Sequence, residues 1–542
     1  MKNLYVFAIG GSGERVMRSF IMLLAAGVKL GADVVHPIFV DNDEKSMALK
    51  RCRDLIKYYN TCADNTTDSK VGIGTICQGL DETKRPSFFQ TKIEAPTFLN
   101  IAGDTIGNLE SIIGKGLSKD KDVEMNILEE RDLLFSKDDL EMKLTVGFVG
   151  NPNIGSIVLN ALSFSDPQFD DIVQKVGNGD GIMVVGSLFG GTGAAGLPLI
   201  INKFKRRDGA RPTIGGVAVL PYFNFDSQDQ YPNGQKIIDT EKWDVNSDSF
   251  SVKTRTALMY YDSYMDNMDY LYYVGDDNRA NYTHYVGGIK QDNPVHLVEL
   301  LGAMSIIDFS KQQNVNNIVY KQPIWGISNS DGGNPTVCNI DSFKNPEIKR
   351  AIVKFQMLRE LFINTKEGFL AHSIENESPF VKDIKFTESI RKACVGESPK
   401  KLYTDVDTFN NCVVQETSNY GHAWGLNAFF KEWVLWCADL NGSMARRTLS
   451  IFPNATEDID KDNITQKFYS ENQSFGIAKT KIKRPLFGTP REVPVEPKIT
   501  DNLLAAHRKL GWRETKDKDI LAVLLKTISD GLDKVLDDSS TI

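Results

Sequence analysis

Three glycine-bearing segments have the composition of loops that bind an anion. They are Gly10-Gly11-Ser12-Gly13, Gly150-Asn151-Pro152-Asn153-Ile154-Gly155 and Gly190-Gly191-Thr192-Gly193-Ala194-Ala195-Gly196. Glycine lets backbone N–H groups approach an anion closely and adopts positive φ angles. Each segment follows a strand pattern and precedes a helix pattern, and in a parallel sheet such loops meet at one edge, beside the positive ends of helices. The sequence therefore predicts a phosphate-binding crevice at that edge.

The first and third segments carry the sharper chemical signals. Gly11-x-Gly13 supplies two glycines of a dinucleotide-binding fingerprint, but Val16 occupies the third position. Because Asp41 follows the second predicted strand, a nicotinamide site remains an alternative, as does a plain strand-to-helix turn without a ligand. Thr192, between two glycines, offers a hydroxyl group to a phosphate or a metal ion. The chain has no G-x-x-x-x-G-K-[ST] segment, which excludes an ordinary P-loop NTPase.

The elements that position these segments alternate between strands and helices. Apolar stretches typical of buried strands span 4–9, 34–40, 144–149, 181–188, 214–220 and 270–274. Helical patterns span 16–28, 155–162, 197–204, 254–265 and the nearly all-apolar stretch 295–309. This alternation predicts an α/β fold with a parallel sheet. Residues 44–142 interrupt the pattern and are interpreted as an insertion.

Composition and charge limit the function classes. The 542 residues are 41% hydrophobic and 25% charged, which is typical of folded globular proteins. The net charge of -8 disfavours a general affinity for nucleic acid or anionic lipid. The seven cysteines are scattered without a C-x-x-C pair, and the sequence has no 18-residue apolar run. We therefore expect a cytoplasmic protein without a transmembrane segment.

The C-terminal half of the sequence carries weaker signals. A hairpin-like stretch at 318–327 precedes an amphipathic helix at 347–362, and the aromatic helix 426–440 is interpreted as core. The basic, proline-spaced stretch 479–498 is interpreted as an exposed linker, with an arm that docks on an acidic neighbour as the alternative. A last amphipathic helix, 519–536, has an apolar face for its own domain or for a partner.

The glycine segments and the strand ends, taken in order, resemble those of the tubulin and FtsZ superfamily of GTPases. Residues 9–13 resemble its first phosphate loop, and 39–43 the segment that ends in an Asn/Asp cluster. Residues 150–155 are similar to its Asn-Pro loop, 189–195 to its glycine-threonine signature, and 221–226 to its ribose loop. The resemblance covers about 290 of the 542 residues, and the order of the loops makes it specific.

The resemblance implies that GTP or GDP binds together with Mg²⁺. The implied nucleotide contacts are Gly10, Gly11, Ser12, Gly13, Asp41, Asn42, Gly150, Asn151, Gly190, Gly191, Thr192, Gly193, Asp226 and Asn293, and the implied metal ligands are Asp41 and Asp43. Asn293 has a helix N-cap as its alternative role, and His296 a place in the core. Glu14-Arg15 departs from the family pattern; Arg15 is expected near phosphate and Glu14 to point away.

The resemblance also implies a domain order and a catalytic segment from a neighbouring subunit. A GTPase domain spans 1–292, a central helix 293–311, a second α+β domain of the activation type 312–478, and a basic linker with the last helix 479–542. The segment that resembles the family's catalytic loop contains Asn339 and Asp341, but Lys344 stands at the second acid, with Glu347 as the nearest substitute. A plain Asx turn is the alternative for this segment.

Three hypotheses follow for the function. The first is a divergent prokaryotic or phage-type GTPase that polymerises head to tail into cytoskeletal filaments, with an adaptor or cargo protein as a further partner. The second keeps the fold as a nucleotide-gated scaffold or sensor without productive hydrolysis, which the Lys344 position favours. The third is a Rossmann-type NAD-dependent oxidoreductase with Asp41 on a ribose, although it leaves the Asn-Pro and Gly-Thr segments unexplained.

Overall fold

The fold is taken from a computed structural model in which two compact units are distinguished. The structure describes residues 1–63, 87–100, 107–113, 118–141, 144, 148, 150–163, 167–205, 211–226, 247–264, 268–276, 279–283, 288–321, 337–339, 345–362, 424–442, 448–450, 479–483, 491–495, 505–506 and 520–537. The first unit comprises Met1–Phe20, Gly31–Arg53 and Glu94–Pro323; the second comprises Ile21–Leu30, Asp54–Ile93 and Ile324–Ile542. Both units are therefore discontinuous in sequence.

The central sheet has eight strands in the order β10-β8-β6-β5-β1-β2-β3, with β4 also paired to β2. The strands are β1 (Asn3–Ile9), β2 (Val34–Asp41), β3 (Lys92–Ile93), β4 (Thr97–Asn100), β5 (Gly181–Ser187), β6 (Thr213–Val219), β8 (Tyr270–Val274) and β10 (Val319–Lys321). The pairings of β1 with β2 and β5, and of β5, β6, β8 and β10 in turn, are all parallel. The predicted α/β fold with a parallel sheet is confirmed.

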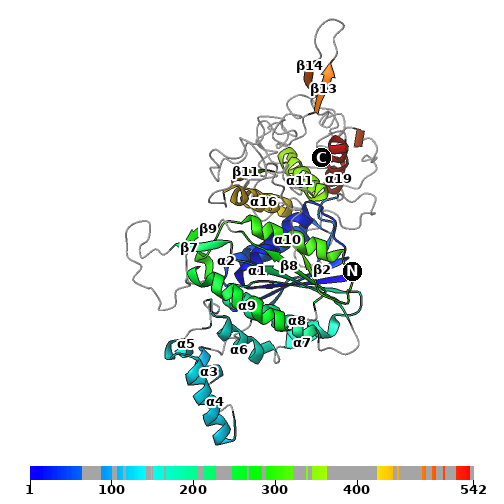
Figure 1. Ribbon diagram of the computed structural model, residues 1–542. Coiled ribbons are helices and arrows are strands. Elements are labelled where there is room, and N and C mark those ends of the chain that lie inside the picture. The colour runs from blue at the N-terminus through cyan, green and yellow to red at the C-terminus, as the bar shows by residue number, and fades with distance from the viewer. Residues whose placement is uncertain are drawn as a thin grey trace, which may run out of the picture. The chain divides into compact units, whose positions relative to one another are not determined.

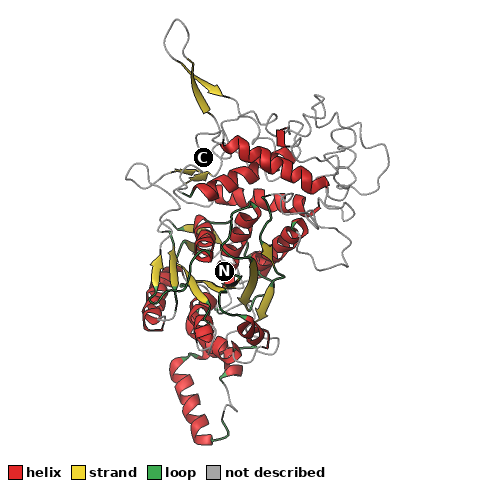
Figure 2. Ribbon diagram, turned by 90° about the vertical axis from the view of Figure 1, so that its right-hand side faces the viewer, coloured by secondary structure: helices red, strands yellow, loops and turns green. Residues whose placement is uncertain are grey.

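Helices cover both faces of this sheet, as Figures 1 and 2 show. Helices α8 (Gly191–Lys205) and α9 (Phe250–Tyr264) lie on one face, and α1 (Gly10–Ala25) and α10 (Leu297–Ser310) on the other. Strands β5 and β6 are buried along their whole length. Their apolar composition follows from this arrangement, because strands covered on both faces cannot alternate with polar residues.

Two helices begin earlier than the sequence predicts. Helix α1 begins at Gly10 instead of Val16, and α8 begins at Gly191 instead of Leu197, so the glycines form first helical turns and not separate loops. Close packing explains the use of glycine inside a helix. A Cβ atom on Gly13 would lie 2.8 Å from the carbonyl carbon of Ala8, a backbone atom of the adjoining strand. Packing of the helix against the strand thus outweighs the low helix propensity of glycine.

Helix α10 begins two residues later than predicted, and its cap differs from the expected one. His296 is the N-cap: its Nδ1 atom accepts the Val298 N–H at 3.1 Å, and the Glu299 side chain accepts the His296 N–H at 3.2 Å. This reciprocal pair is a capping box with histidine in the place of serine or threonine. His296 is fully buried, as in the core alternative, although its Nε2 atom has no hydrogen-bond partner among the described residues. Asn293 lies outside the helix and does not cap it.

Residues 44–142, interpreted as an insertion, supply part of the sheet. Within them lie β3 and β4 as well as α2 (Met47–Cys62), α3 (Leu109–Ile112), α4 (Lys121–Leu134) and α5 (Lys137–Glu141). Strand β4 pairs in parallel with β2. Figures 1 and 2 show α4 extending away from the sheet, and none of its residues is buried. Most of the predicted strand 144–149 lies outside the described residues.

The prediction of a hairpin at 318–327 is wrong for β10 (Val319–Lys321), the described strand of this stretch. This strand pairs in parallel with β8, so its partner is 49 residues earlier at the first register pair, Val319 with Tyr270. Residues 322–327 lie outside the described part of the chain. The apolar and aromatic composition signals a strand, but it does not reveal a partner distant in sequence.

The second unit contains helices α11 (Pro346–Phe362), α16 (Trp424–Gly442) and α19 (Ile520–Asp537), close to their predicted bounds. The prediction that the aromatic helix forms core is confirmed, because Phe429, Phe430, Trp433 and Trp436 are fully buried. The stretch 479–498 is not a plain linker: β13 (Lys479–Lys483) and β14 (Arg491–Val495) pair as antiparallel strands. Strands β11 (Val337–Asn339) and β12 (Thr448–Ser450) form a second, parallel pair. Among the described residues, no helix combines the length and the apolar character needed to span a membrane.

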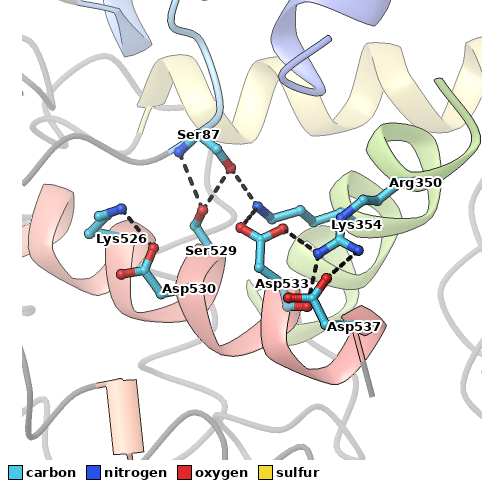
Figure 3. Close-up of polar contacts among 8 residues, drawn as sticks. All are labelled: Ser87, Arg350, Lys354, Lys526, Ser529, Asp530, Asp533 and Asp537. Atoms are coloured by element: carbon cyan, nitrogen blue, oxygen red, sulfur yellow. Dashed lines mark hydrogen bonds and ion pairs between the residues drawn. The ribbon is translucent and has the colours of Figure 1, made fainter. Parts of the chain in front are cut away.

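An ion-pair cluster attaches α19 to α11 (Figure 3). Arg350 contacts Asp533 at 3.0 Å and Asp537 at 2.8 Å. Lys354 pairs with Asp533 as well and donates to the Ser87 hydroxyl at 2.6 Å. The Lys354 side chain is only 6% exposed, and burial lowers the pKa of this lysine. Asp533 therefore compensates a charge that has little access to water.

We expect Asp533→Ala to destabilise the second unit by about 2 kcal/mol, because Lys354 would remain buried without its carboxylate partner. The value is below that of a fully buried pair because the Asp533 side chain is 37% exposed. Asp530→Ala is the matched control, since Asp530 pairs with Lys526 one turn away on the same helix. Urea unfolding followed by tryptophan fluorescence measures both. Equal losses of stability in the two variants would contradict this role of Asp533.

Candidate functional site

The first unit has a cavity of about 230 Å³ at the carboxyl end of its central strands. Its walls come from Gly10, Gly11, Ser12, Arg15, Asp41, Asp43, Ser46, Ala48, Phe148, Gly150, Ser187, Phe189, Gly190, Gly191, Thr192, Gly193, Phe223, Phe225, Phe250, Gly288, Gln291 and Asn293. The order of the sheet reverses between β1 and β5, because later strands add on opposite sides of them. Ligands of open α/β sheets bind at this kind of switch point. The cavity thus lies where the topology favours a ligand.

All three predicted glycine segments meet at this cavity. Gly10 and Gly11 begin α1, Gly150 precedes α6 (Pro152–Ser163), and Gly190 precedes α8. The first N–H groups of a helix have no partner within the helix and carry partial positive charge. Three such helix ends on one cavity form a site for an anion with several oxygen atoms.

The glycines on the cavity wall differ in the space that they leave for a side chain. A Cβ atom on Gly191 would lie 2.8 Å from the Cβ of Phe148 and 3.1 Å from the Asn151 N atom, so this position is closed by packing. A Cβ atom on Gly11 would meet no heavy atom within 4 Å. Gly11 therefore leaves space in the cavity, whereas Gly191 is required for the approach of two backbone segments.

Further predicted nucleotide contacts and catalytic residues are Asn42, Asp226, Asn339, Asp341 and Glu347. Asn42 is buried and donates from its Nδ2 atom to the Leu144 carbonyl group at 2.8 Å. It does not line the cavity. Asp341 and the side chains of Asp226 and Asn339 lie outside the described residues. Glu347 belongs to the second unit, where its Oε1 atom accepts the Lys29 N–H at 3.1 Å.

Gly13 and Asn151 are predicted contacts that the structure places beside the cavity instead of on its wall. Gly13 is closed off by the backbone of β1. The N atom of Asn151 donates to the Phe148 carbonyl group at 2.7 Å. Both residues thus shape the backbone of the site.

Several wall residues were not predicted. They are the aromatic residues Phe148, Phe189, Phe223, Phe225 and Phe250, together with Ser46, Ser187 and Gln291. Phe223 and Phe225 are two positions apart in β7 (Phe223–Asp226), a spacing that places side chains on the same face of a strand. This alternation is the one sequence signal that was available for the aromatic wall.

Three carboxylates lie together at the acidic side of the site. Asp41 and Asp43 line the cavity, and Glu14 is fully buried behind it, where its Oε2 atom accepts the Ser46 hydroxyl at 2.8 Å. Burial, with the neighbouring charge of Asp41 as the next cause, raises the pKa of Glu14 to about 8. Burial also raises the pKa of Asp41 to about 7, although the Asn42 N–H group opposes the shift. These carboxyl groups are costly to ionise together without a cation.

The donor set fits a Mg²⁺ ion that is shared with a ligand. The Oε1 atom of Glu14 and the Oδ1 atom of Asn42 are buried without a hydrogen-bond partner among the described residues. Carboxylate oxygens are the ligands that Mg²⁺ prefers, and it usually combines one or two of them with phosphate oxygens and water. The described residues contain no group of three His, Cys, Asp or Glu side chains arranged to hold a metal alone. Asp41 and Asp43 therefore fit the metal only with a phosphate ligand.

We expect the stability of the ligand-free protein to decrease as the pH rises from about 4.5 to about 8, the ordinary and the raised pKa of Glu14. In that window the unfolded chain releases the Glu14 proton while the folded chain retains it, which favours unfolding. Glu14→Gln should remove much of this slope and stabilise the protein at pH 8 by roughly 1–3 kcal/mol.

Urea unfolding at several pH values between 5 and 8 tests this expectation. Glu110→Gln is the control, because the Glu110 side chain is 54% exposed and far less affected by burial. Asp41, Asp43 and Arg15 are the other charged groups that act on Glu14, and all three are unchanged in both variants. An unaltered pH slope in Glu14→Gln would contradict the assignment.

A buried polar cluster closes the opposite side of the cavity. The Nε atom of Arg15 donates to Glu299 at 2.7 Å, and its Nη2 atom donates to the Tyr222 hydroxyl at 2.8 Å. The Tyr222 hydroxyl donates in turn to Glu299 at 2.8 Å. Burial and the nearby Arg15 charge lower the pKa of His296 to about 3, so this histidine is neutral. It does not line the cavity, contrary to its expected availability to a ligand base.

Comparison with protein-family models and with curated protein sequences finds no match to this chain. Helix N-termini, two carboxylates, a hydroxyl group and aromatic rings on one cavity are the groups needed for phosphates, a divalent cation and a planar ring.

Proposed function

We propose that the protein binds GTP with Mg²⁺ in this cavity and hydrolyses it when subunits assemble head to tail into filaments. The observation that carries the binding step is the convergence of three helix N-termini on one cavity at the switch point of a parallel sheet. The guanine base, the hydrolysis and the assembly are implied by the resemblance to the tubulin and FtsZ superfamily. They are proposals that depend on this resemblance.

Each group on the cavity wall has a role in this proposal. The N–H groups at Gly10, Gly11 and Gly191 to Gly193 bind phosphate oxygens, and the Thr192 hydroxyl donates to the terminal phosphate. Asp41 and Asp43 hold Mg²⁺, which neutralises phosphate charge when it is bound. The aromatic residues exclude water from the opposite side and flank a planar base.

The hydrolytic step requires a group that orients water. We assign this role to Asp341 of the neighbouring subunit, with Asn339 beside it, because their segment resembles the family's catalytic loop. Glu347 is a weaker candidate, since its carboxylate already accepts the Lys29 N–H group. In a head-to-tail polymer, each interface would then complete one active site.

Two alternative functions can be distinguished from this proposal by experiment. A nucleotide-gated scaffold or sensor would bind GTP without productive turnover. An NAD-dependent oxidoreductase is favoured by the strand order alone, because β1, β2, β5, β6 and β8 follow the order of dinucleotide-binding sheets.

Calorimetric titration of the full chain with GTP, GDP and NADH, each with Mg²⁺, tests the binding step. Saturable binding of GTP and GDP, together with no binding of NADH, supports the proposal. Saturable binding of NADH alone would overturn it in favour of the oxidoreductase. A chain that binds none of these three ligands would refute the nucleotide site itself.

A further inference from the structure

One nitrogen atom of the Arg15 guanidinium has no hydrogen-bond partner in the part of the chain that the structure describes. Its Nε and Nη2 atoms donate to Glu299 and Tyr222, while Nη1 has no partner among the described residues. The side chain is 11% exposed, and Nη1 is not among the buried unpaired polar atoms. Because Arg15 lines the cavity, a ligand there can reach its side chain, and Nη1 is the nitrogen that Glu299 and Tyr222 do not hold.

The surrounding groups fix the orientation of this guanidinium. Glu299 and Tyr222 hold two of its three nitrogen atoms, and its carbon lies 5.5 Å from the centre of the Phe223 ring. Glu299 is itself held by the capping box of α10. A planar guanidinium held on two sides and stacked on an aromatic ring is oriented before a ligand arrives.

Asn293 supplies a second donor at the same end of the cavity. Its Oδ1 atom accepts the Gln291 Nε2 group at 2.7 Å, which assigns Nδ2 as the free end of the amide. Within the described ranges, Nδ2 of Asn293 has no hydrogen-bond partner. Arg15, Gln291 and Asn293 all line both the main cavity and a smaller hollow, so the two donors lie close to each other.

We propose that Arg15 selects the base of the nucleotide by donating to a carbonyl oxygen on its edge; this inference depends on the proposed function. A planar ring between the aromatic side chains would present its edge to two donors, Arg15 Nη1 and Asn293 Nδ2. A 6-oxopurine offers acceptors at O6 and N7, and arginine is the residue that pairs with them most often. Adenine carries an amino group in the place of O6, so the Arg15 donor would face a second hydrogen-bond donor.

The test compares nucleotides that differ at carbon 6 of the base. GTP and ITP carry a carbonyl group there, while ATP and 2,6-diaminopurine riboside triphosphate carry an amino group. Calorimetry on the full chain with Mg²⁺ should show that the first pair binds about 10-fold or more tightly than the second. ITP separates carbonyl recognition from contacts to the 2-amino group of guanine.

Arg15→Ala/Glu299→Gln leaves no buried charge unpaired, whereas Glu299→Gln leaves the Arg15 guanidinium with the Tyr222 hydroxyl and a neutral amide as its partners. Arg15→Ala/Glu299→Gln removes the donor together with its carboxylate partner, and Glu299→Gln alone is the control that retains Arg15. The control should keep the preference for the carbonyl pair, and the double variant should bind all four nucleotides within about threefold of one another.

Each outcome bears on the inference separately from the proposed function. A double variant that loses affinity equally for all four nucleotides would show that Arg15 binds phosphate, which overturns the inference and leaves the nucleotide site intact. A double variant that keeps the preference, or a wild-type protein that binds ITP as weakly as ATP, also overturns it. A wild-type protein that binds no nucleotide refutes both.

Discussion

Gly11→Asp should reduce the affinity for GTP about 100-fold or more while leaving the fold intact. Gly11 lines the cavity in the first turn of α1, and a Cβ atom there meets no heavy atom within 4 Å. The new carboxylate would lie beside the phosphates, and juxtaposed like charges cost several kcal/mol. An acidic residue in the first turn of a helix is favourable, so thermal stability should not decrease.

Two further variants make this result specific. Gly107→Asp introduces the same charge at an exposed glycine that does not line the cavity, and a Cβ atom on Gly107 would also meet no heavy atom within 4 Å. We expect it to bind GTP like the wild type. Gly11→Ala adds volume without charge and should give an intermediate affinity. Wild-type affinity in Gly11→Asp, with an unchanged melting temperature, would exclude the cavity as the phosphate site.

Asp341→Ala should lower GTP turnover about 100-fold or more while the dissociation constant for GTP changes by less than about threefold. The expectation follows from the proposed role of the carboxylate, which orients water at a neighbour's nucleotide and does not hold the nucleotide of its own subunit. Single-turnover hydrolysis and calorimetry measure the two quantities independently.

Mixing two inactive variants tests whether Asp341 acts on the next subunit. Gly11→Asp subunits retain Asp341 but lack bound nucleotide, and Asp341→Ala subunits retain nucleotide but lack the acid. In an equal mixture that assembles, random pairing should restore roughly a quarter of the wild-type turnover per total subunit. Glu110→Gln, at an exposed carboxylate that does not line the cavity, is the control and should turn over GTP like the wild type. The absence of any recovery, in a mixture that pellets normally, would contradict catalysis between subunits.

The central sheet was predictable because its strands are buried on both faces. β5 and β8 appear at their predicted positions, since an unbroken apolar stretch of strand length has few other interpretations. The meeting of the glycine segments at one cavity was predictable for a related reason. Once the strands are parallel, the glycine segments that follow them must meet at one edge.

Helix starts and caps were less predictable because they depend on packing. Gly13 lies inside α1 because its missing Cβ admits the backbone of the adjoining strand, a contact that no local pattern encodes. His296 caps α10 through its Nδ1 atom, although histidine is not a typical N-cap residue. Both features become clear only when the neighbouring elements are present.

Long-range polar contacts were the least predictable part of the site. Arg15 and Glu299 are 284 residues apart, and neither position has an unusual local sequence. The structure places the Arg15 guanidinium against Glu299 and the Phe223 ring, two partners that the sequence did not indicate. Partners of buried charges are determined by the topology of the fold, so sequence spacing carries little information about them.

The most direct test of the account is GTP turnover per subunit measured across a wide range of protein concentrations, with sedimentation in GTP and in a slowly hydrolysed analogue. We expect turnover to rise steeply above a threshold concentration, at which protein also begins to sediment with the analogue. That result is predicted because the active site is completed at an interface between subunits. Firm GTP binding with turnover independent of concentration, and no sedimentation, would contradict assembly-dependent hydrolysis and favour the scaffold.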